Sequence, residues 1–397
     1  MTSETFTENP FLQNRLQELG IREYSAIQKA VIPHAENKED IFAIAPAGSG
    51  KTYAYLIPIL ECIPHQNTAK HKPSALILSP TRELCSQIAD TSRSLLAGQE
   101  GIRTALLTGG ADMNTQVRKF SKGADIVVAT PARILDHLRR HSFHPDQCSI
   151  LVLDECDEML SMGFLEQVQQ VIREVSPQQI MLFSATASDQ VRSLAESMLK
   201  HPFSITIEAD PSFQAEPDLY HLILPEEQQT DAIAALLRHQ SKALVFCNTR
   251  SGCDRLSVQL NHRGIRCGSL HSQMDPAFRR KLLKEFRAGS LPVLIATDVA
   301  ARGLDLPDLD LVISAGWPDQ EEFLVHRISR TARNRKSGKA ILLLLPKDQN
   351  QILKIPALTG KRSRPYPYRS GERHRPSSSD KRRPIRRNRS HSAGNRR

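Results

Sequence analysis

The chain has 397 residues, of which 40% are hydrophobic and 24% are charged. This length can bury large cores and, at about 150 residues per domain, predicts two domains. No apolar run approaches the roughly 18 residues that span a bilayer, and the opening MTSETFTENP is polar where a secretory signal would be cationic and then apolar. We therefore expect a soluble, cytoplasmic protein with no membrane partner. The seven cysteines are odd in number and lack a C-x-x-C pair, so we interpret them as reduced thiols.

The net charge of +10 is concentrated at the C-terminal end. From Lys361 to Arg397 there are 14 Lys and Arg residues against two acids, so this segment carries +12 and the rest of the chain carries −2. The segment holds four prolines and seven serines, and Ile385 is its only large aliphatic residue. Such a composition predicts a disordered tail. The tail is either a solubilising segment or an arginine-rich arm that binds a polyanion, and its arginine content favours the arm.

Short apolar runs alternate with helix-like stretches along the chain. Strands are expected at 41–44, 75–78, 125–129, 150–154, 180–183, 243–246, 293–296 and 311–314, with helices between them, clearest at 82–97, 189–200, 231–239 and 279–289. The apolar runs do not alternate with polar residues, which is typical of parallel sheets buried on both faces. The expected fold class is therefore α/β, with parallel sheets covered by helices. Each run ends in a polar cluster, where open α/β sheets bind their ligands.

The best domain boundary is the acidic, proline-containing stretch 206–220, which separates two complete β/α series. We expect a first domain over residues 1–208, a linker over 209–218, a second domain over 219–357 and the tail over 358–397. This division predicts a cleft between the two domains. No period of 20 to 50 residues repeats, so a solenoid is excluded.

A glycine-rich segment follows the first expected strand and precedes a helix-like stretch, which is the context of a phosphate-binding loop. It comprises Ala45, Pro46, Ala47, Gly48, Ser49, Gly50, Lys51 and Thr52. Glycine lets backbone N–H groups turn toward phosphate oxygens, Lys51 neutralises phosphate charge and the Thr52 hydroxyl can bind Mg²⁺. Ala45 stands where the simple pattern has glycine. An ordinary glycine-rich turn is the alternative interpretation.

A second buried run, ILVLDECDE, delivers Asp154 and Glu155 to the same end of the sheet. Adjacent carboxylates can divide two tasks: Asp154 positions Mg²⁺, partly through its water shell, and Glu155 orients and deprotonates an attacking water. Taken alone, such a pair is as well explained by a solvated loop. Together with the phosphate loop, it predicts a site that hydrolyses a nucleoside triphosphate.

These residues resemble a DEAD-box RNA helicase of superfamily 2, with DECD at 154–157 in place of the eponymous tetrad. The resemblance extends over about residues 11–345 and implies two RecA-like domains. Upstream, Phe11, Tyr24 and Gln28 resemble the family's Q motif, in which Gln28 would bind the adenine edge of ATP. A glutamine amide donates and accepts in one plane, as adenine requires. On an amphipathic helix, Gln28 would otherwise be a surface residue.

Further polar clusters resemble the family's RNA-contacting motifs. The RNA-contacting residues would be Pro80, Thr81, Arg82, Gly110, Thr130 and Arg133 in the first domain and Thr249, Arg250 and Thr297 in the second. Hydroxyls, backbone N–H groups and arginines suit phosphates and sugars, so we expect a preference for RNA over DNA and little base specificity. Thr-Arg after a strand is otherwise a common helix start.

A coupling motif is expected after the strand at 180–183. The hydroxyls of Ser184 and Thr186 would connect the nucleotide site to strand separation by bonding Asp154 or Asp157. A Ser/Thr pair after a strand is also a frequent helix N-cap, and the two roles can coexist.

The second domain would complete the nucleotide site. Asp305 resembles the residue that senses the ribose or the γ-phosphate. Arg330 and Arg333 resemble paired arginine fingers, which meet phosphate bidentately and make hydrolysis depend on domain closure. Arginines three apart are otherwise a solvated helix face. Four positions depart from the family pattern and leave finger placement and turnover open: Ser329, Ala332 and Arg335, where glycine is usual, and Pro276, where glutamine is usual.

The resemblance implies an ATP-dependent RNA helicase with Mg²⁺ as cofactor. It would bind RNA across the cleft and locally unwind short duplexes, or remodel RNA–protein complexes, as ATP is hydrolysed. One alternative is an RNA-binding clamp or annealing factor with weak or no hydrolysis. Another is a DNA-directed motor, which the adenine-binding Gln28 disfavours. We expect a monomer, and the sequence identifies neither the cellular RNA nor a protein partner.

Overall fold

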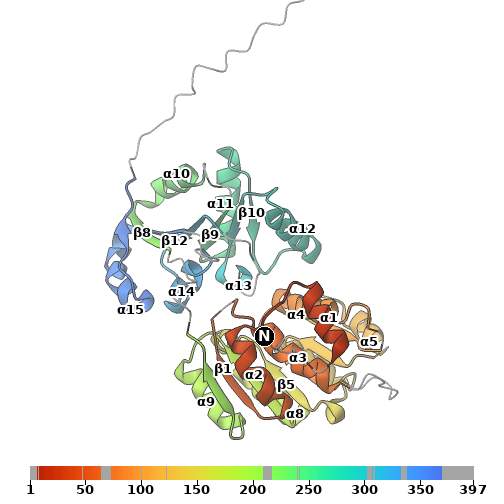
Figure 1. Ribbon diagram of the computed structural model, residues 1–397. Helices are drawn as coiled ribbons and strands as arrows, with labels where there is room; N and C mark the ends of the chain where they lie inside the picture. Colours follow the sequence, from red (N-terminus) through yellow and green to blue (C-terminus); the bar gives the residue numbers. More distant parts are fainter. Residues whose placement is uncertain are drawn as a thin grey trace, which may run out of the picture.

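The computed structural model describes residues 7, 9–46, 48–63, 73–99, 101–121, 123–208, 217–238, 240, 242–301, 306, 309–331 and 338–368. Over these residues the chain forms two halves, each built on one parallel sheet (Figure 1). In the part of the chain so described, no helix is both long enough and apolar enough to cross a membrane.

The first half contains a sheet of seven described strands in the order β3-β4-β2-β5-β6-β1-β7. All its pairings are parallel. The strands are β1 (Ile41–Ile44), β2 (Ala75–Leu78), β3 (Thr104–Leu107), β4 (Ile126–Ala129), β5 (Ile150–Leu153), β6 (Gln179–Ser184) and β7 (Phe203–Thr206). Because parallel neighbours need a crossover, each of the strands β1 to β6 is followed by at least one helix that returns the chain to the amino ends of the strands.

Helices cover both faces of this sheet. They are α1 (Pro10–Glu18), α2 (Ala26–Glu36), α3 (Lys51–Cys62), α4 (Arg82–Leu95), α5 (Met113–Phe120), α6 (Pro131–Arg139), the short η1 (Pro145–Gln147), α7 (Cys156–Ser161), α8 (Leu165–Val175) and α9 (Asp189–Met198). In β2, Ile77 packs in the core under α1 to α4, whereas its neighbour Leu78 packs in the opposite core under α6 to α9. Both faces of the strand are therefore apolar, which explains the unbroken hydrophobic runs.

The second half repeats this plan, with seven described strands in the order β10-β11-β9-β12-β13-β8-β14. The strands are β8 (Asp218–Ile223), β9 (Ala243–Cys247), β10 (Cys267–Leu270), β11 (Val293–Ala296), β12 (Leu311–Ala315), β13 (Lys339–Leu344) and β14 (Arg364–Pro365). The helices are α10 (Glu226–Leu237), α11 (Arg250–His262), α12 (Pro276–Arg287), α13 (Asp298–Ala301), α14 (Glu322–Ile328), η2 (Pro346–Lys354) and α15 (Ile355–Thr359). Helices α10 and α11 pack on one face, and α12 to α15 pack on the other. The predicted fold class, two parallel sheets covered by helices, is confirmed.

The end of the second half corrects the expected start of the tail at residue 358. Strand β14 pairs with β8, the Arg364 guanidinium lies 2.8 Å from the Asp218 carboxylate, and the Tyr366 ring meets the Tyr220 ring at 5.4 Å. Tyr366 and Tyr368 pack against the core of the second half. The charge of this segment predicted disorder, but the Tyr366 and Tyr368 rings bury apolar surface against the second half. Residues 369–397 lie outside the described residues.

The expected limits between the two domains stay a prediction. The first sheet ends with Thr206 in β7, and the second begins with Asp218 in β8. Residues 209–216, the greater part of the expected linker, lie outside the described residues.

Candidate functional site

Apart from Phe11, Tyr24 and Gln28, which precede β1, the expected nucleotide and RNA motifs of the first half follow strands at their carboxyl ends. Since every strand is parallel, these ends lie along one edge of the sheet. The lateral order places the phosphate loop after β1 beside Ser184 at the end of β6, then Asp154 after β5, and then Thr81 after β2. Residues that are more than 100 positions apart in the chain therefore become neighbours.

The phosphate loop turns back on itself before α3. Gly48 and Gly50 have left-handed backbones, with φ of 80° and 97°. The Lys51 ammonium is buried and donates to the carbonyl oxygens of Ala45 at 2.6 Å and Pro46 at 3.3 Å. The buried Ser49 hydroxyl has no partner among the described residues. The loop thus holds a cation and an unsatisfied polar group, which suits an anion. Ala47 lies outside the described residues.

Gln28 connects α2 to the phosphate loop. Its Oε1 accepts from the Ser25 backbone N–H at 2.9 Å, and its Nε2 donates to the Gly50 carbonyl at 3.1 Å. The alternative that Gln28 is an ordinary surface residue of the helix is excluded, because its side chain is buried. Each polar atom of the amide keeps a further hydrogen or lone pair for a ligand.

The two aromatic residues expected near Gln28 occupy different surroundings. Phe11 on α1 lies beside Gly98, just beyond the end of α4. Tyr24 is half-buried against the core, where burial and then the Glu61 and Glu36 carboxylates raise its pKa.

Asp154 and Glu155 stand where β5 ends. Asp154 is 3% exposed; its Oδ1 accepts from the Glu155 backbone N–H at 3.1 Å, and its Oδ2 accepts from the Tyr55 hydroxyl at 3.0 Å. Burial raises the pKa of Asp154, and the nearby Lys51 ammonium opposes this rise. Burial, then the Asp154 and Glu158 carboxylates, raise the pKa of Glu155 to about 8, whereas Lys51 and Arg330 lower it. The site therefore concentrates negative charge that a cation would stabilise.

Sequence reasoning missed Tyr55. It lies four residues after Lys51 on α3, so the two side chains share one helix face. Its hydroxyl is buried and is held beside the Asp154 carboxylate, which orients that carboxylate. A tyrosine within an otherwise apolar helix was the available signal, because a buried hydroxyl needs a partner.

The coupling motif is arranged only partly as expected. Thr186 donates both its hydroxyl and its backbone N–H to Asp157 Oδ2, each at 3.0 Å. The Ser184 hydroxyl instead donates to the Thr186 carbonyl at 2.7 Å. Neither residue caps the next helix, because Ser188 is the N-cap of α9. The Ser184 hydroxyl thus shapes the turn, and Thr186 makes the contact with the acidic tetrad.

Three expected RNA-contacting elements of the first half meet at the other end of this edge. Thr81 caps α4, since its hydroxyl accepts from Leu84 N–H at 3.2 Å. The adjacent Arg82 guanidinium packs on the Gly109–Gly110 turn so closely that a side chain on Gly110 would collide with it. Arg133 donates to the Ala111 carbonyl at 3.1 Å from α6, which Thr130 precedes. Arg82 and Arg133 thus contact adjacent residues of one turn, whereas Pro80 and Thr81, just before Arg82, are buried.

In the second half, a buried arginine that we did not single out organises the corresponding edge. Arg327 is 1% exposed and donates to Asp298 through Nε at 2.7 Å and Nη2 at 2.6 Å. Its Nη2 also donates to the Asn248 side chain at 2.7 Å. Asn248 precedes Thr249, the N-cap of α11, and Asp298 follows Thr297. Arg327 therefore holds together the two segments that contain the expected RNA-contacting residues Thr249, Arg250 and Thr297.

Charged side chains of the two halves contact each other, and α13 and α14 lie on the side of the second half that faces the first (Figure 1). Arg279 Nε lies 2.5 Å from Glu83 Oε1, and His326 Nδ1 lies 3.5 Å from Glu158 Oε1. Arg279 also donates to the Ala300 carbonyl at 2.9 Å, so it keeps its place one turn after Pro276. Arg330 lies close enough to Glu155 to lower its pKa.

Four residues expected at or near the nucleotide site lie outside the described residues: Asp305, Ala332, Arg333 and Arg335. Ser329 ends α14, and its hydroxyl donates to the His326 carbonyl at 3.0 Å.

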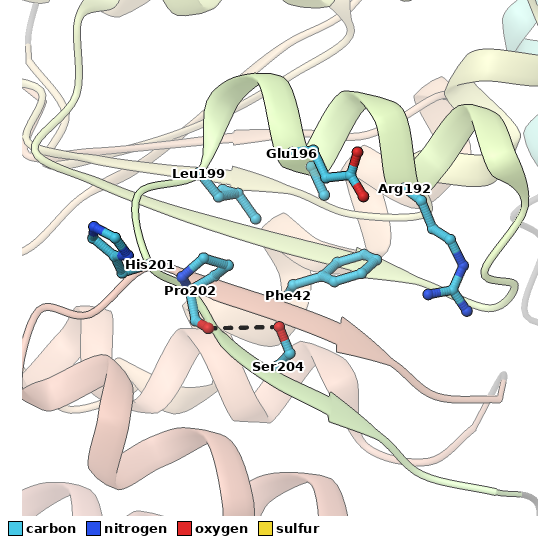
Figure 2. Close-up of a pocket in the computed structure, with 8 residues that line it drawn as sticks. Phe42, Arg192, Glu196, Leu199, His201, Pro202 and Ser204 are labelled. Atoms are coloured by element: carbon cyan, nitrogen blue, oxygen red, sulfur yellow. Dashed lines mark hydrogen bonds between the residues drawn. The ribbon is translucent and has the colours of Figure 1, made fainter.

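A hollow of about 400 Å³ lies apart from these groups, between α9 and the strands β1 and β7 (Figure 2). It is lined by Phe42, Arg192, Ala195, Glu196, Leu199, His201, Pro202 and Ser204. Phe42 is the second residue of β1, and His201 lies just before the amino end of β7. The hollow therefore lies near the amino ends of these strands. The phosphate loop follows the opposite, carboxyl end of β1.

Comparison with known proteins agrees with this arrangement. Residues 25–194 match the DEAD/DEAH box helicase domain, and residues 228–335 match the helicase conserved C-terminal domain. The chain belongs to the DEAD/DEAH box helicases. It is 36% identical over 351 residues to the DEAD-box ATP-dependent RNA helicase CshA of Bacillus cereus and 35% identical over 350 residues to CshA of Listeria monocytogenes. These matches cover 88% and 87% of this chain but 66% of each relative, so the chain spans slightly less than two thirds of their length.

Solved structures of DEAD-box proteins share the fold. S. cerevisiae Dbp5 bound to RNA and ADP BeF3 is 28% identical with a TM-score of 0.78, and the match covers 90% of this chain and 94% of Dbp5. A DEAD box protein from Methanococcus jannaschii is 32% identical, with coverage of 90% and 97%, but its TM-score is 0.51. The protein with the lower sequence identity, RNA-bound Dbp5, therefore superposes on this chain with the higher TM-score.

The phosphate loop generates a test of its geometry. Alanine at Gly50 must adopt a positive φ and would displace the Gln28 amide, whereas alanine at Gly48 meets nothing within 4 Å. Both substitutions cost about 1–2 kcal/mol for the left-handed backbone, and Gly50→Ala also disrupts buried hydrogen bonds worth about 1 kcal/mol each. We expect the melting temperature of Gly50→Ala to fall several degrees below that of Gly48→Ala, measured by circular dichroism. Equal melting temperatures would show that Gln28 is not held by the loop.

Proposed function

We propose that this chain is an ATP-dependent RNA helicase, which binds RNA across the cleft and locally unwinds or remodels short RNA duplexes or RNA–protein complexes as it hydrolyses ATP. The observation that carries the proposal is the approach of Arg330, from the second half, to Glu155 beside the phosphate loop of the first half. A site divided between two halves can act only when they are together. The relatives named ATP-dependent RNA helicases, and the superposition on Dbp5 bound to RNA and ADP BeF3, support it.

ATP would bind at the phosphate loop. Lys51 turns its ammonium from the loop carbonyls to the phosphates, and the Ser49 hydroxyl gains the partner that it lacks among the described residues. The backbone N–H groups at the start of α3 also face this position, where a helix N-terminus favours an anion. Gln28 reads adenine with the hydrogen-bonding capacity that Ser25 and Gly50 leave free.

The residues present fit Mg²⁺. Thr52 follows Lys51 on α3, and burial raises the pKa of the Asp154 carboxylate, so a bound cation would stabilise its charged form. We assign both residues to Mg²⁺, with Asp154 acting partly through water, and the ion would neutralise phosphate charge when bound. Tyr55 fixes the orientation of Asp154.

Hydrolysis needs a base and a cation on opposite sides of the γ-phosphate. Glu155 orients the attacking water and accepts its proton, so the DECD tetrad at 154–157 acts as this chain's form of the DEAD tetrad. Arg330 and Arg333 stabilise the charge that develops on the phosphoryl group, and Asp305 senses the ribose or γ-phosphate. Thr186 transmits the state of the site through Asp157, to which it donates twice.

RNA would lie along the surface formed by Thr81, Arg82, Gly110, Thr130 and Arg133 and continue onto Thr249, Arg250 and Thr297. These groups suit phosphates and sugars, so binding depends on the A-form backbone and the 2′-hydroxyl. ATPase assays with RNA, with DNA and without nucleic acid test the proposal. Stimulation by RNA alone supports a helicase; stimulation by DNA indicates a DNA motor; RNA binding without turnover indicates a clamp or annealing factor.

Two substitutions separate nucleotide binding from hydrolysis. Lys51→Ala removes a phosphate contact, so we expect weaker ATP binding. Glu155→Gln keeps the phosphate contacts and removes the base, so we expect ATP to stay bound and the RNA complex to accumulate. RNA-stimulated hydrolysis should fall by at least ~10²-fold in each variant. Fluorescent nucleotide binding and phosphate release measure the two effects, and undiminished turnover in Glu155→Gln would exclude it as the base.

The arginines of the second half generate a second test. Arg330→Ala or Arg333→Ala should lower RNA-stimulated turnover by ~10³-fold or more, while full-length protein still binds ATP. Arg192→Ala is the matched control, since Arg192 is exposed on α9 beside the hollow of Figure 2. Normal turnover in both finger variants would mean that Ser329, Ala332 and Arg335 have moved the arginines from the site, and would favour the clamp.

Two truncations test whether the basic tail contributes to RNA binding, because Tyr366 and Tyr368 at its start pack against the second half. Removing residues 369–397 deletes 11 Lys and Arg residues against two acids. We expect weaker RNA binding and a shallower salt dependence, with the logarithmic slope smaller by about 0.7 for each phosphate that the tail neutralises, and unchanged saturated ATP turnover. Removing residues 361–397 also deletes Tyr366 and Tyr368, so only this truncation should lower the melting temperature. Identical affinities and slopes for chains 1–368 and 1–397 would make the tail a solubilising segment.

A further inference from the structure

A buried polar chain lies directly behind the Gly109–Gly110 turn and joins α5 to α6. Gln116 on α5 is 7% exposed, and His137 on α6 is fully buried. The surrounding side chains are apolar: the Phe120 ring meets the His137 ring edge-on at 6.2 Å and stacks with Phe143 at 6.1 Å. Polar groups in such surroundings are costly unless each one is paired.

Gln116 holds both ends of the four-residue turn 108–111. Its Nε2 donates to the Thr108 carbonyl at 2.7 Å and, over a longer distance of 3.5 Å, to the Ala111 carbonyl. The amide nitrogen has two hydrogens, one for each carbonyl. Between these carbonyls, Gly110 has a left-handed backbone with φ of 81°. The turn thus depends on a side-chain donor from outside it.

The position of the amide nitrogen decides the protonation of His137. Because Nε2 of Gln116 faces two carbonyls, its Oε1 must face His137 Nε2, which lies 3.4 Å away and therefore carries the hydrogen. His137 Nδ1 then lies 2.8 Å from the Ser142 hydroxyl, whose single hydrogen is shared between Nδ1 and the His137 carbonyl at 3.1 Å. Burial, and then the Arg133 charge, lower the pKa of His137 to about 4, which keeps the ring neutral. Every polar atom of the two side chains has a partner.

The same turn bears the expected RNA-contacting residues on its other side. Arg82 packs against Gly109 and Gly110, and Arg133 donates to the Ala111 carbonyl at 3.1 Å. The Ala111 carbonyl oxygen therefore accepts hydrogen bonds from both Gln116 and Arg133. A displacement of the turn would move all three groups relative to one another.

We propose that Gln116 and His137 are positioning residues for RNA binding: they hold the turn 108–111 where Arg82, Gly110 and Arg133 form one surface. This inference rests on the proposed function. Gln116 and His137 lie behind the turn and do not themselves contact RNA. They act through the two carbonyls that bound the turn, and they are separate from the phosphate loop.

A pair of substitutions separates positioning from stability. Gln116→Leu leaves His137 without an acceptor and the turn without its donor, so it should lower both stability and RNA affinity. In the double variant Gln116→Leu/His137→Phe, the new ring joins Phe120 and Phe143 and no buried donor is orphaned, so stability should largely recover. The turn still lacks its donor, so RNA affinity should stay about tenfold reduced in both variants.

Three measurements on the full chain decide the outcome: the melting temperature, the salt dependence of RNA affinity, and hydrogen exchange of residues 109–112 without RNA. We expect faster exchange in both variants, a salt slope smaller by about 0.7 for each phosphate that the displaced turn no longer engages, and an unchanged KM for ATP at saturating RNA. Gln170→Leu is the matched control, because Gln170 lies on α8 and its amide donates to the Glu174 carboxylate in an exposed hydrogen bond of 2.7 Å.

Recovery of RNA affinity together with stability in the double variant would overturn the inference, because the two residues would then act only through the core. Unchanged exchange in the turn would overturn it too, since Gln116 would not hold the turn. If the unmodified chain binds no RNA, the proposed function fails and the inference fails with it. Faster exchange in Gln116→Leu would then still establish that Gln116 holds the turn, so the two failures are distinguishable.

Discussion

Every functional group proposed here depends on the parallel direction of the strands. In each half, helices cover both faces of the sheet, so polar residues from different strands come together in the loops and helix starts that follow the strands. Parallel pairing brings all the carboxyl ends to one edge. In the first half this edge contains the phosphate loop, Thr186, Asp154 and Thr81 in spatial order, although their order in the chain differs. The spacing of motifs along the sequence is therefore free to vary, whereas the order of strands in the sheet is not.

Where the two halves meet, the first contributes carboxylates and the second contributes basic side chains. The first half contributes the carboxylates Glu83, Asp154, Glu155 and Glu158, and the second contributes Arg279, His326 and Arg330 opposite them. Burial raises the pKa of Asp154 and of Glu155, and the Asp154 carboxylate raises that of Glu155 further, which is an unfavourable arrangement for the first half alone. Arg330 of the second half partly offsets it at Glu155. Contact between the halves is thus favoured by two groups that the proposed hydrolysis would use, Glu155 and Arg330.

The sequence predicts strands better than side-chain partners. Four to six apolar residues that end in a polar cluster predict a buried parallel strand, and the carboxylates Asp154 and Glu155 follow such a run directly. Tyr55 could not be connected to Asp154 in this way, because the two lie 99 positions apart and meet only in the folded sheet. Arg327 was missed for the same reason, since its partners Asn248 and Asp298 follow other strands. Gln116 bonds a turn only five to eight residues before it, but its place in a polar helix gave no sign that its amide is buried. The strand β14 was missed because composition placed Tyr366 among charged residues, and composition ignores what two aromatic rings can bury.

One non-glycine residue at the edge where ligands would bind, Glu155, has a strained backbone. Gly48, Gly50 and Gly110 have positive φ values that glycine adopts without cost, but Glu155 has a φ of 52° and a side chain. A left-handed non-glycine residue costs about 1–2 kcal/mol, and the surrounding structure must hold it there. The Glu155 N–H donates to Asp154 Oδ1, and the Glu155 carbonyl accepts from Met159 N–H at 3.1 Å, so both sides of the residue are fixed. The strained backbone turns Glu155 out of the line of β5 while Asp154 stays buried beneath it. Two adjacent carboxylates consequently occupy different positions, which is the geometry that the proposed roles, Asp154 for the metal and Glu155 for the attacking water, require.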